Sequence, residues 1–158
     1  MDSPISRFLQ VDDLLATAAQ PTPGQLDWLR EQGFEAVLNL STPTARNFVA
    51  DEARMAMEAG LEYVHAPVDC SRLVPAHYEL VRGVLAAFAG RKVLVHCAGN
   101  VKSSALVQLW RMKERGEDRA RLTAELRDLG WHEPKWFDYL ERMMREQPEA
   151  PGDLSAAA

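Results

Sequence analysis

Residues 93–104, with the sequence VLVHCAGNVKSS, decide the fold of this chain. Three consecutive apolar residues, Val93 to Val95, indicate a strand that is buried on both faces, as in the centre of an α/β sheet. The strand ends on His96 and Cys97, and a short run of small and polar residues leads into the apolar sequence ALVQLW, which is typical of a helix. The stretch is therefore a buried strand, a tight loop and a buried helix, with a thiol where strand and loop meet.

Strand-like and helix-like segments alternate along the rest of the chain, which is the pattern of βα units on a largely parallel sheet. Further strands are expected at 14–20, 35–40 and 61–68, and helices at 23–32, 75–90, 104–115, 117–129 and 134–146, with one more that carries Met55 and Ala59 inward and ends at Gly60. We predict a single α/β domain over residues 1–147, with a central, mostly parallel sheet of about four to five strands flanked by helices. Residues 148–158 mix Pro, Gly, Ala and acidic residues without periodicity, which predicts a flexible C-terminal tail.

Composition narrows the classes of function. With 47% hydrophobic and 26% charged residues, the chain has the balance of an ordinary globular domain. A formal charge of −5 argues against nucleic acid as a partner, because such binding depends on clustered Lys and Arg, and the basic residues from Arg111 to Arg127 alternate with acidic ones as on a solvated helix face. No apolar run approaches the about 20 residues of a membrane span, and the first residues lack the pattern of a signal peptide. We therefore expect a cytoplasmic protein with no membrane partner.

The position of Cys97 favours chemistry. Open α/β sheets bind ligands at the carboxyl ends of their strands, and the loop after Cys97 leads into a helix whose first N–H groups have no partner within the helix. These groups and the helix dipole form an anion site, and the small residues Ala98 and Gly99 let a phosphate approach closely. In that field, beside the cation of Lys102, a thiol pKa falls several units below its ordinary value of about 8.5. The sequence thus predicts a thiolate nucleophile.

Other readings of these residues stay open. Cys97 is alternatively a small buried hydrophobic residue. His96 either tunes the thiolate through a hydrogen bond or packs at the end of the strand. The two cysteines are too few for a disulfide framework, and the four histidines show no metal-ligand spacing, so no cofactor is expected.

The stretch VHCAGNVKSSALVQLWR resembles the signature of the cysteine-dependent protein tyrosine and dual-specificity phosphatase superfamily, and most closely a small bacterial branch of it. The likeness extends through AAQPTPGQLDWLREQGFEAVLNL, DEARMAMEAGLEYVHAPVD and WHEPKWFDYL, and so covers most of residues 14–140. The resemblance implies a phosphocysteine intermediate on Cys97, formed from a phosphorylated protein or a small aryl phosphate. The residues that it implies around the phosphate are Ala98, Gly99, Asn100, Val101, Lys102 and Ser103.

Lys102 departs from the pattern of that superfamily. The widespread signature places an arginine at position 103, where the chain has Ser103, and the bacterial branch places it at the position of Lys102. An arginine fork holds two phosphate oxygens in plane, whereas lysine offers a point charge, and losing one such bond in the transition state costs about 10²–10³ in rate. The first alternative is therefore a catalytically impaired relative that binds phosphate or phosphorylated partners. The second is a rhodanese-like sulfurtransferase, whose active cysteine also lies on a short loop after a strand.

The resemblance also requires a proton donor, and Asp69 is the candidate. It follows the strand at 61–68, at the carboxyl edge of the same sheet, although an ordinary turn aspartate is the other interpretation. Ser103 and Ser104 are each candidates to donate a hydrogen bond to the departing thiolate, with one of them serving only as the helix N-cap. Cys70, next to Asp69, raises the hypothesis of a reversible disulfide that protects Cys97 from overoxidation.

Two further groups of residues allow a functional or a packing role. The aromatic residues Trp131, Trp136 and Phe137 are expected to pack the C-terminal helix on the sheet rather than to form a substrate cage. Arg46, in the loop at 41–48, either meets a substrate phosphate or is exposed without a role.

Overall fold

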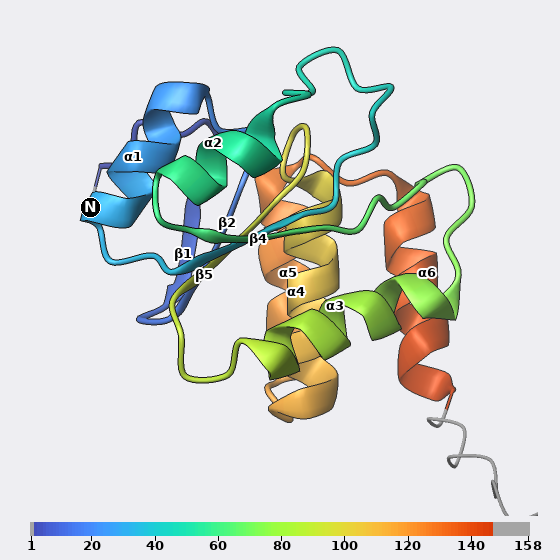
Figure 1. Ribbon diagram of the computed structural model, residues 1–158. Coiled ribbons are helices and arrows are strands. Elements are labelled where there is room, and N and C mark those ends of the chain that lie inside the picture. Colours follow the sequence, from blue (N-terminus) through green and yellow to red (C-terminus); the bar gives the residue numbers. More distant parts are fainter. Residues whose placement is uncertain (1, 147–158) are drawn as a thin grey trace, which may run out of the picture.

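The computed structural model describes residues 2–146, which form a five-stranded sheet with helices on both faces (Figure 1). The strands are β1 (Leu9–Asp12), β2 (Leu15–Ala18), β3 (Ala36–Asn39), β4 (Glu62–His65) and β5 (Val93–His96). The helices are α1 (Pro23–Glu31), α2 (Glu52–Glu58), α3 (Pro75–Ala87), α4 (Val101–Glu114), α5 (Arg119–Leu129) and α6 (Pro134–Arg145). The tail predicted at 148–158 lies outside the described residues.

The sheet has the strand order β1-β2-β5-β3-β4, which places β5 in the centre as its apolar sequence predicts. All neighbouring strands run parallel except β1 and β2, which are antiparallel. The predicted class, a single α/β domain with a mostly parallel sheet, is confirmed. The edge strand β1 was not predicted, because its four residues LQVD contain only two apolar side chains and all four lie partly open to solvent.

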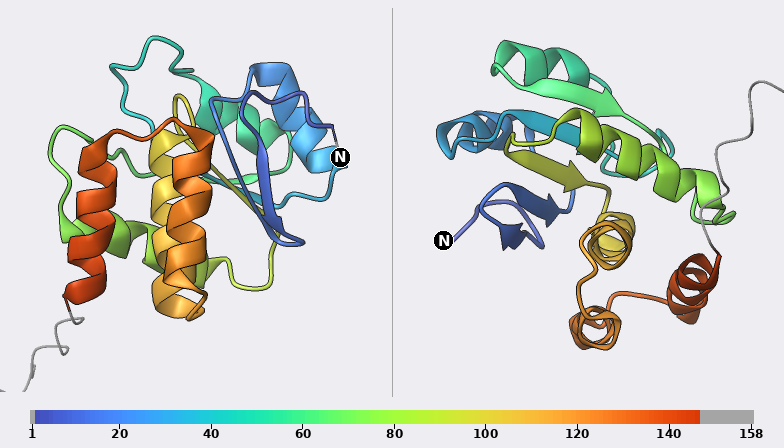
Figure 2. Two further views of the ribbon diagram at one scale, coloured as in Figure 1. Left: turned by 180° about the vertical axis from the view of Figure 1, so that it is seen from behind. Right: turned by 90° about the horizontal axis from the view of Figure 1, so that it is seen from below.

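Helices cover both faces of the sheet. Helices α1 and α2 lie on one face, while α3 and α4 lie on the other, with α5 and α6 packed against the outer side of α4 (Figure 2). Successive residues of a strand point to opposite faces, so Val93 and Val95 contact the α3 and α4 side while Leu94 contacts the α1 and α2 side. Each face of β5 is therefore buried in its own cluster of apolar side chains.

The helix after β5 begins earlier than predicted. We expected it to start at residue 104 and the loop to extend from 97 to 103, but α4 begins at Val101. The reason is Asn100, whose left-handed backbone (φ 62°) reverses the chain within three residues of Cys97 and acts as the N-cap of α4. Lys102 and Ser103 therefore lie on the first turn of a helix and are held more firmly than loop residues.

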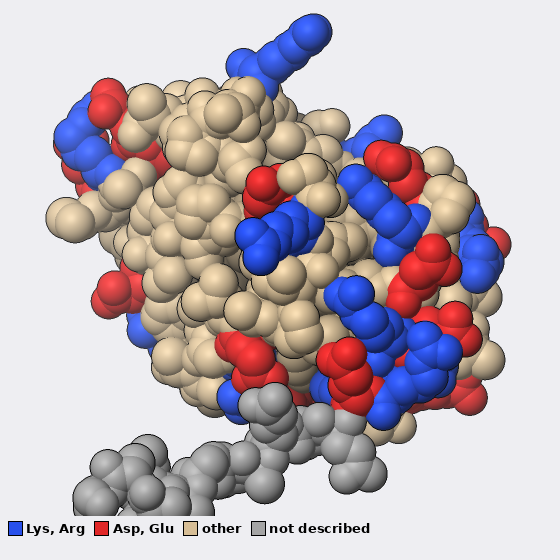
Figure 3. Space-filling model, turned by 90° about the vertical axis from the view of Figure 1, so that its right-hand side faces the viewer, with Lys and Arg blue, Asp and Glu red and all other residues tan. Residues whose placement is uncertain are grey.

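The alternating charges predicted on the later helices form ion pairs. Arg111 and Glu117 approach to 2.8 Å, and Arg121 and Glu125 approach to 2.8 Å. Figure 3 shows Lys and Arg side chains next to Asp and Glu on the face that it presents. No helix within residues 2–146 is long and apolar enough to cross a lipid bilayer.

Substitutions at Gly83 and Gly130 test this description of the backbone. Gly83 lies exposed in the interior of α3, and a Cβ there would meet nothing within 4 Å. Gly83→Ala should therefore raise the free energy of unfolding by about 0.5–1 kcal/mol, because alanine restricts the unfolded chain. Gly130 caps α5 with φ 72°, so Gly130→Ala should lower the free energy of unfolding by about 1 kcal/mol. Urea denaturation measures both, and changes of the same sign would contradict the assignment.

Candidate active site

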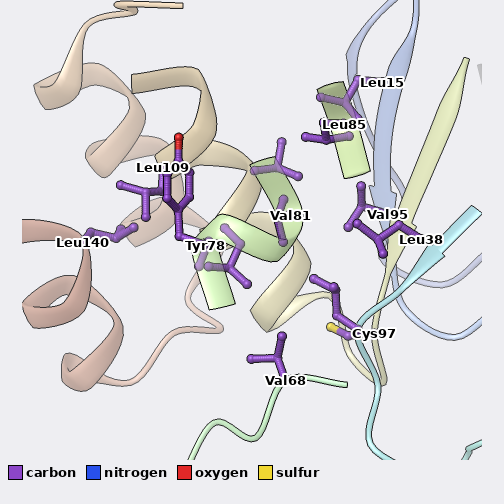
Figure 4. Close-up of a cluster of buried hydrophobic side chains, with 14 of the residues drawn as sticks. Leu15, Leu38, Val68, Tyr78, Val81, Leu85, Val95, Cys97, Leu109 and Leu140 are labelled. Carbon is purple, nitrogen blue, oxygen red and sulfur yellow. The ribbon is translucent and has the colours of Figure 1, made fainter. Parts of the chain in front are cut away.

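Cys97 and His96 point to opposite faces of the sheet because they are consecutive residues at the end of β5. The side chain of Cys97 is 1% exposed and packs with Val68 and Ala105 in the cluster on the α3 and α4 side (Figure 4). His96 is fully buried, and its Nε2 lies 2.9 Å from Oε2 of Glu52 on α2. The imidazole of His96 is thus engaged away from the thiol, which favours its packing role over direct tuning of the sulfur.

The carbonyl oxygens of the 97–100 loop are held on its outer side. The oxygen of Ala98 accepts hydrogen bonds from the backbone N–H of Gln20 at 3.3 Å and from Nδ2 of Asn47 at 3.0 Å. The oxygen of Gly99 accepts from Nη1 of Arg7 at 3.1 Å. A peptide group points its N–H away from its C=O, so fixing these oxygens outward turns the N–H groups to the inner side of the loop. N–H groups that are turned inward before a helix N-terminus favour an anion.

Asn100 holds the junction between loop and helix. Its Nδ2 donates to the backbone oxygen of Arg7 at 2.8 Å and to Oγ1 of Thr17 at 3.1 Å. Its own backbone oxygen accepts from Oγ of Ser104 at 2.5 Å, and the same hydroxyl lies 2.9 Å from Nε2 of His132. The expectation that Ser103 or Ser104 caps the helix is therefore wrong, because Asn100 occupies that position.

The two serines differ in what their hydroxyls contact. Ser104 Oγ is used by Asn100 and His132, as described above. Ser103 is fully buried, and within residues 2–146 its Oγ has no hydrogen-bond partner. Buried hydroxyls in folded proteins almost always have a hydrogen-bond partner. The Ser103 hydroxyl, which has none among these residues, is therefore available to a further group next to the first turn of α4. Of the two candidates, Ser103 keeps a proton free to donate.

Asp69 is exposed and lies in a tight turn. Its Oδ1 accepts from Oγ of Ser71 at 2.7 Å and from the backbone N–H of Ser71 at 2.9 Å. These hydrogen bonds, together with the positive charge of Lys102, hold the pKa of Asp69 below its ordinary value. Asp69 is thus a turn aspartate and also lies within electrostatic reach of the cation on α4.

A buried carboxylate supports the loop from below. Glu52, the first residue of α2, is 1% exposed, and its Oε2 accepts from Nδ2 of Asn39 at 3.0 Å and from the hydroxyl of Tyr63 at 2.8 Å, besides its contact with His96. Its Oε1 accepts from Nε2 of Gln20 at 2.5 Å. Burial acts to raise the pKa of Glu52, but the hydrogen bonds and charge of His96, with the bonds from Tyr63 and Gln20, outweigh it and lower that pKa.

Sequence reasoning missed four residues that position the loop: Arg7, Gln20, Asn47 and Glu52. Arg7 and Asn47 lie in segments that looked like ordinary loops, Gln20 is the last residue of the strand predicted at 14–20, and Glu52 lies near the start of a predicted helix. For Glu52 a signal existed, because its spacing of four from buried Ala56 places it on the inward face of α2. For Arg7, Gln20 and Asn47, the contact with the 97–100 loop is seen only in the folded structure.

The remaining candidates have mixed outcomes. Trp136 is buried in the core and Phe137 packs against the core, as expected, whereas Trp131 stacks on the guanidinium of Arg7 at 4.4 Å. Arg46 is exposed. Cys70 and Cys97 are both free thiols, so the proposed disulfide stays a prediction. Within residues 2–146, no group of three His, Cys, Asp or Glu side chains is placed to hold a metal ion.

Comparison with known proteins agrees with this geometry. Residues 9–135 match the family model described as DSP-PTPase phosphatase fused to NAD+ kinase. The chain therefore belongs to this family, a branch of the cysteine-dependent protein tyrosine and dual-specificity phosphatase superfamily. No curated protein sequence matches the chain.

Three solved structures show the same fold. A candidate phosphatase of the DUF442 group from Shewanella putrefaciens CN-32 is 26% identical with a TM-score of 0.79, over 88% of this chain and 89% of that one. TpbA of P. aeruginosa in complex with pTyr is 18% identical with a TM-score of 0.70, over 92% and 86% of the two chains. The core catalytic domain of the PP-IP phosphatase SIW14 from S. cerevisiae is 15% identical with a TM-score of 0.72, over 87% and 85%. The sulfurtransferase alternative is not favoured.

The buried network makes a testable contribution to stability. Glu52→Gln removes the charge and leaves donors without an acceptor, so the free energy of unfolding at pH 7 should fall by about 2–4 kcal/mol. Because folding lowers the pKa of Glu52, its contribution is fully present above its ordinary pKa of 4.5 and is lost as the pH falls through the lower folded value. The difference between wild type and variant should therefore shrink on acidification.

Denaturation of both proteins between pH 7 and pH 3 measures this difference. Glu58→Gln is the matched control, since Glu58 lies on the same helix with 63% of its side chain exposed and should change stability by at most about 0.5 kcal/mol. Equal effects of the two substitutions would show that the buried carboxylate has no special role.

Proposed function

We propose that this chain is a phosphomonoester hydrolase in which Cys97 attacks the phosphorus of phosphotyrosine in a protein, or of a small aryl phosphate. The observation that supports the proposal most directly is the 97–100 loop. Its carbonyl oxygens are tied outward to Arg7, Gln20 and Asn47, which leaves N–H groups facing the side where a phosphate would meet the thiol. We place this activity in the cytoplasm as part of the proposal.

The first step transfers the phosphoryl group to sulfur. The Cys97 thiolate forms the S–P bond while the bond between phosphorus and the phenolic oxygen breaks. Asp69, in its protonated form, gives its proton to that oxygen, so the leaving group departs as a neutral phenol. The pKa of Asp69 is low in the free protein, and the negative charge of a bound phosphate would raise it toward the value that a proton donor needs.

The second step hydrolyses the phosphocysteine. Water attacks phosphorus, the P–S bond breaks, and the Asp69 carboxylate takes the proton of the water. The Ser103 hydroxyl, buried and free of other partners within residues 2–146, would donate a hydrogen bond to the departing thiolate and stabilise it. N–H groups at the start of α4 and the ammonium of Lys102 would balance the charge of the phosphoryl oxygens.

A phosphate-binding protein without turnover is the second candidate, and Lys102 is the observation that favours it. Lysine neutralises charge but cannot hold two phosphoryl oxygens in one plane as arginine does. Binding of the ground state then suffers less than stabilisation of the transition state. The two candidates make different predictions for the same variants.

Hydrolysis of p-nitrophenyl phosphate by wild type, Cys97→Ser and Lys102→Arg separates them. We expect Cys97→Ser to reduce the rate to background, and Lys102→Arg to raise kcat/KM by about tenfold or more, because the fork returns. Wild-type turnover no higher than that of Cys97→Ser, with inorganic vanadate still bound, would establish the binding protein instead.

The role of Asp69 is tested with leaving groups of different quality. Phenol needs a proton more than p-nitrophenol, so Asp69→Asn should lower kcat for phenyl phosphate by about 10²–10³ and for p-nitrophenyl phosphate by about tenfold or less. Asp51→Asn, at another exposed turn, serves as the control and should change neither rate. Equal losses on both substrates would leave Asp69 as a turn residue only.

A further inference from the structure

Arg7 combines an unusual backbone conformation with a contact to the 97–100 loop. Its φ is 51°, in the left-handed region that residues other than glycine, asparagine and aspartate seldom adopt. Such conformations persist where surrounding contacts hold them, and they cluster at functional sites. Here the backbone oxygen of Arg7 accepts the hydrogen bond from Nδ2 of Asn100 at 2.8 Å, so the turn at residue 7 is tied directly to the N-cap of α4.

The guanidinium of Arg7 lies against the loop from outside. Nη1 donates to the oxygen of Gly99 at 3.1 Å, and a Cβ added to Gly99 would lie 3.6 Å from this nitrogen. The guanidinium also stacks on the indole of Trp131, with 4.4 Å from Cζ to the ring centroid, which fixes the orientation of the planar group. Within residues 2–146, no carboxylate lies within salt-bridge distance of Arg7.

This placement acts on the anion site through one peptide group. A cation on the oxygen of Gly99 polarises the peptide bond and makes the N–H of Asn100, on its other end, a stronger donor. The guanidinium also places a positive charge on the outer side of the loop that carries Cys97. Both effects favour an anion at a site where Lys102 occupies the position of the signature arginine.

We infer that Arg7 is a positioning residue of the phosphate site, which provides from outside the loop part of the donor strength and rigidity that Lys102 lacks compared with the signature arginine. The inference rests on the proposed role of Cys97. It requires no contact between Arg7 and substrate, since its guanidinium acts through Gly99 and Asn100.

The test removes the charge without disturbing the backbone. Arg7→Asn suits this purpose because asparagine accepts a positive φ readily, so the variant should fold at least as well as wild type. Arg7→Lys keeps the charge but loses the planar stacking on Trp131. Arg54→Asn is the matched control, because it removes an arginine on α2 whose side chain is 57% exposed.

The first readout is the pH dependence of alkylation of Cys97 by iodoacetamide, followed on its peptide by mass spectrometry so that Cys70 does not interfere. Sulfur displaces iodide only as thiolate, so the rate at each pH follows the thiolate fraction. At neutral pH, Arg7→Asn should slow the alkylation about tenfold, with Arg7→Lys between this rate and that of wild type. A profile of Arg7→Asn that coincides with that of Arg54→Asn would overturn the inference.

The second readout is the affinity for inorganic vanadate in two backgrounds. In the wild-type background, Arg7→Asn should weaken binding by about tenfold, and in the Lys102→Arg background by less, because the restored fork makes the outer cation less important. Equal losses in both backgrounds would contradict compensation for Lys102. If wild type neither binds vanadate nor hydrolyses p-nitrophenyl phosphate, the proposed function fails, whereas alkylation still tests Arg7 because it needs no turnover.

Discussion

The site depends on a constraint on two peptide groups, whose carbonyl oxygens belong to Ala98 and Gly99. The N–H groups of the 97–100 loop can face inward together only while the carbonyl oxygens on the other side have partners, since a buried or half-buried carbonyl without one costs free energy. The chain supplies these partners from Gln20, Asn47 and Arg7, which come from three separate segments. The direction of these N–H groups is thus set by contacts on the far side of the loop.

Beneath this loop lies a second layer of polar contacts. Strand alternation directs His96 to the α1 and α2 face, where the carboxylate of Glu52 also binds Gln20, Asn39 and Tyr63. Gln20 connects the two layers, because its side chain donates to Glu52 while its backbone N–H donates to Ala98. Each member of such a buried network depends on its hydrogen-bond partners. A substitution at one end therefore alters the hydrogen bonds at the other end.

The fold could be predicted from the sequence where apolar runs were long and turn residues clear. The central position of β5 follows from Val93 to Val95, and the helix ends at Gly60 and Gly130 from glycine chemistry. Of the candidate site, the sequence mainly predicted residues that lie close to Cys97 in the chain. What could not be predicted were the contacts across the chain, because a hydrogen bond such as that of Asn47 to Ala98 joins residues whose neighbourhoods carry no common pattern. The start of α4 was misplaced for a related reason, since the left-handed conformation of Asn100 is sustained by Arg7 and Thr17.

The bonds that shape the loop span long stretches of chain: 92 residues separate Arg7 from Gly99, and 51 separate Asn47 from Ala98. Contacts between such distant residues are completed late in folding, because bringing the segments together costs entropy before any bond is gained. A partly folded molecule without these outward ties would not yet hold the 97–100 loop in its final shape. The shape of this loop is thus among the last features to form as the chain assembles.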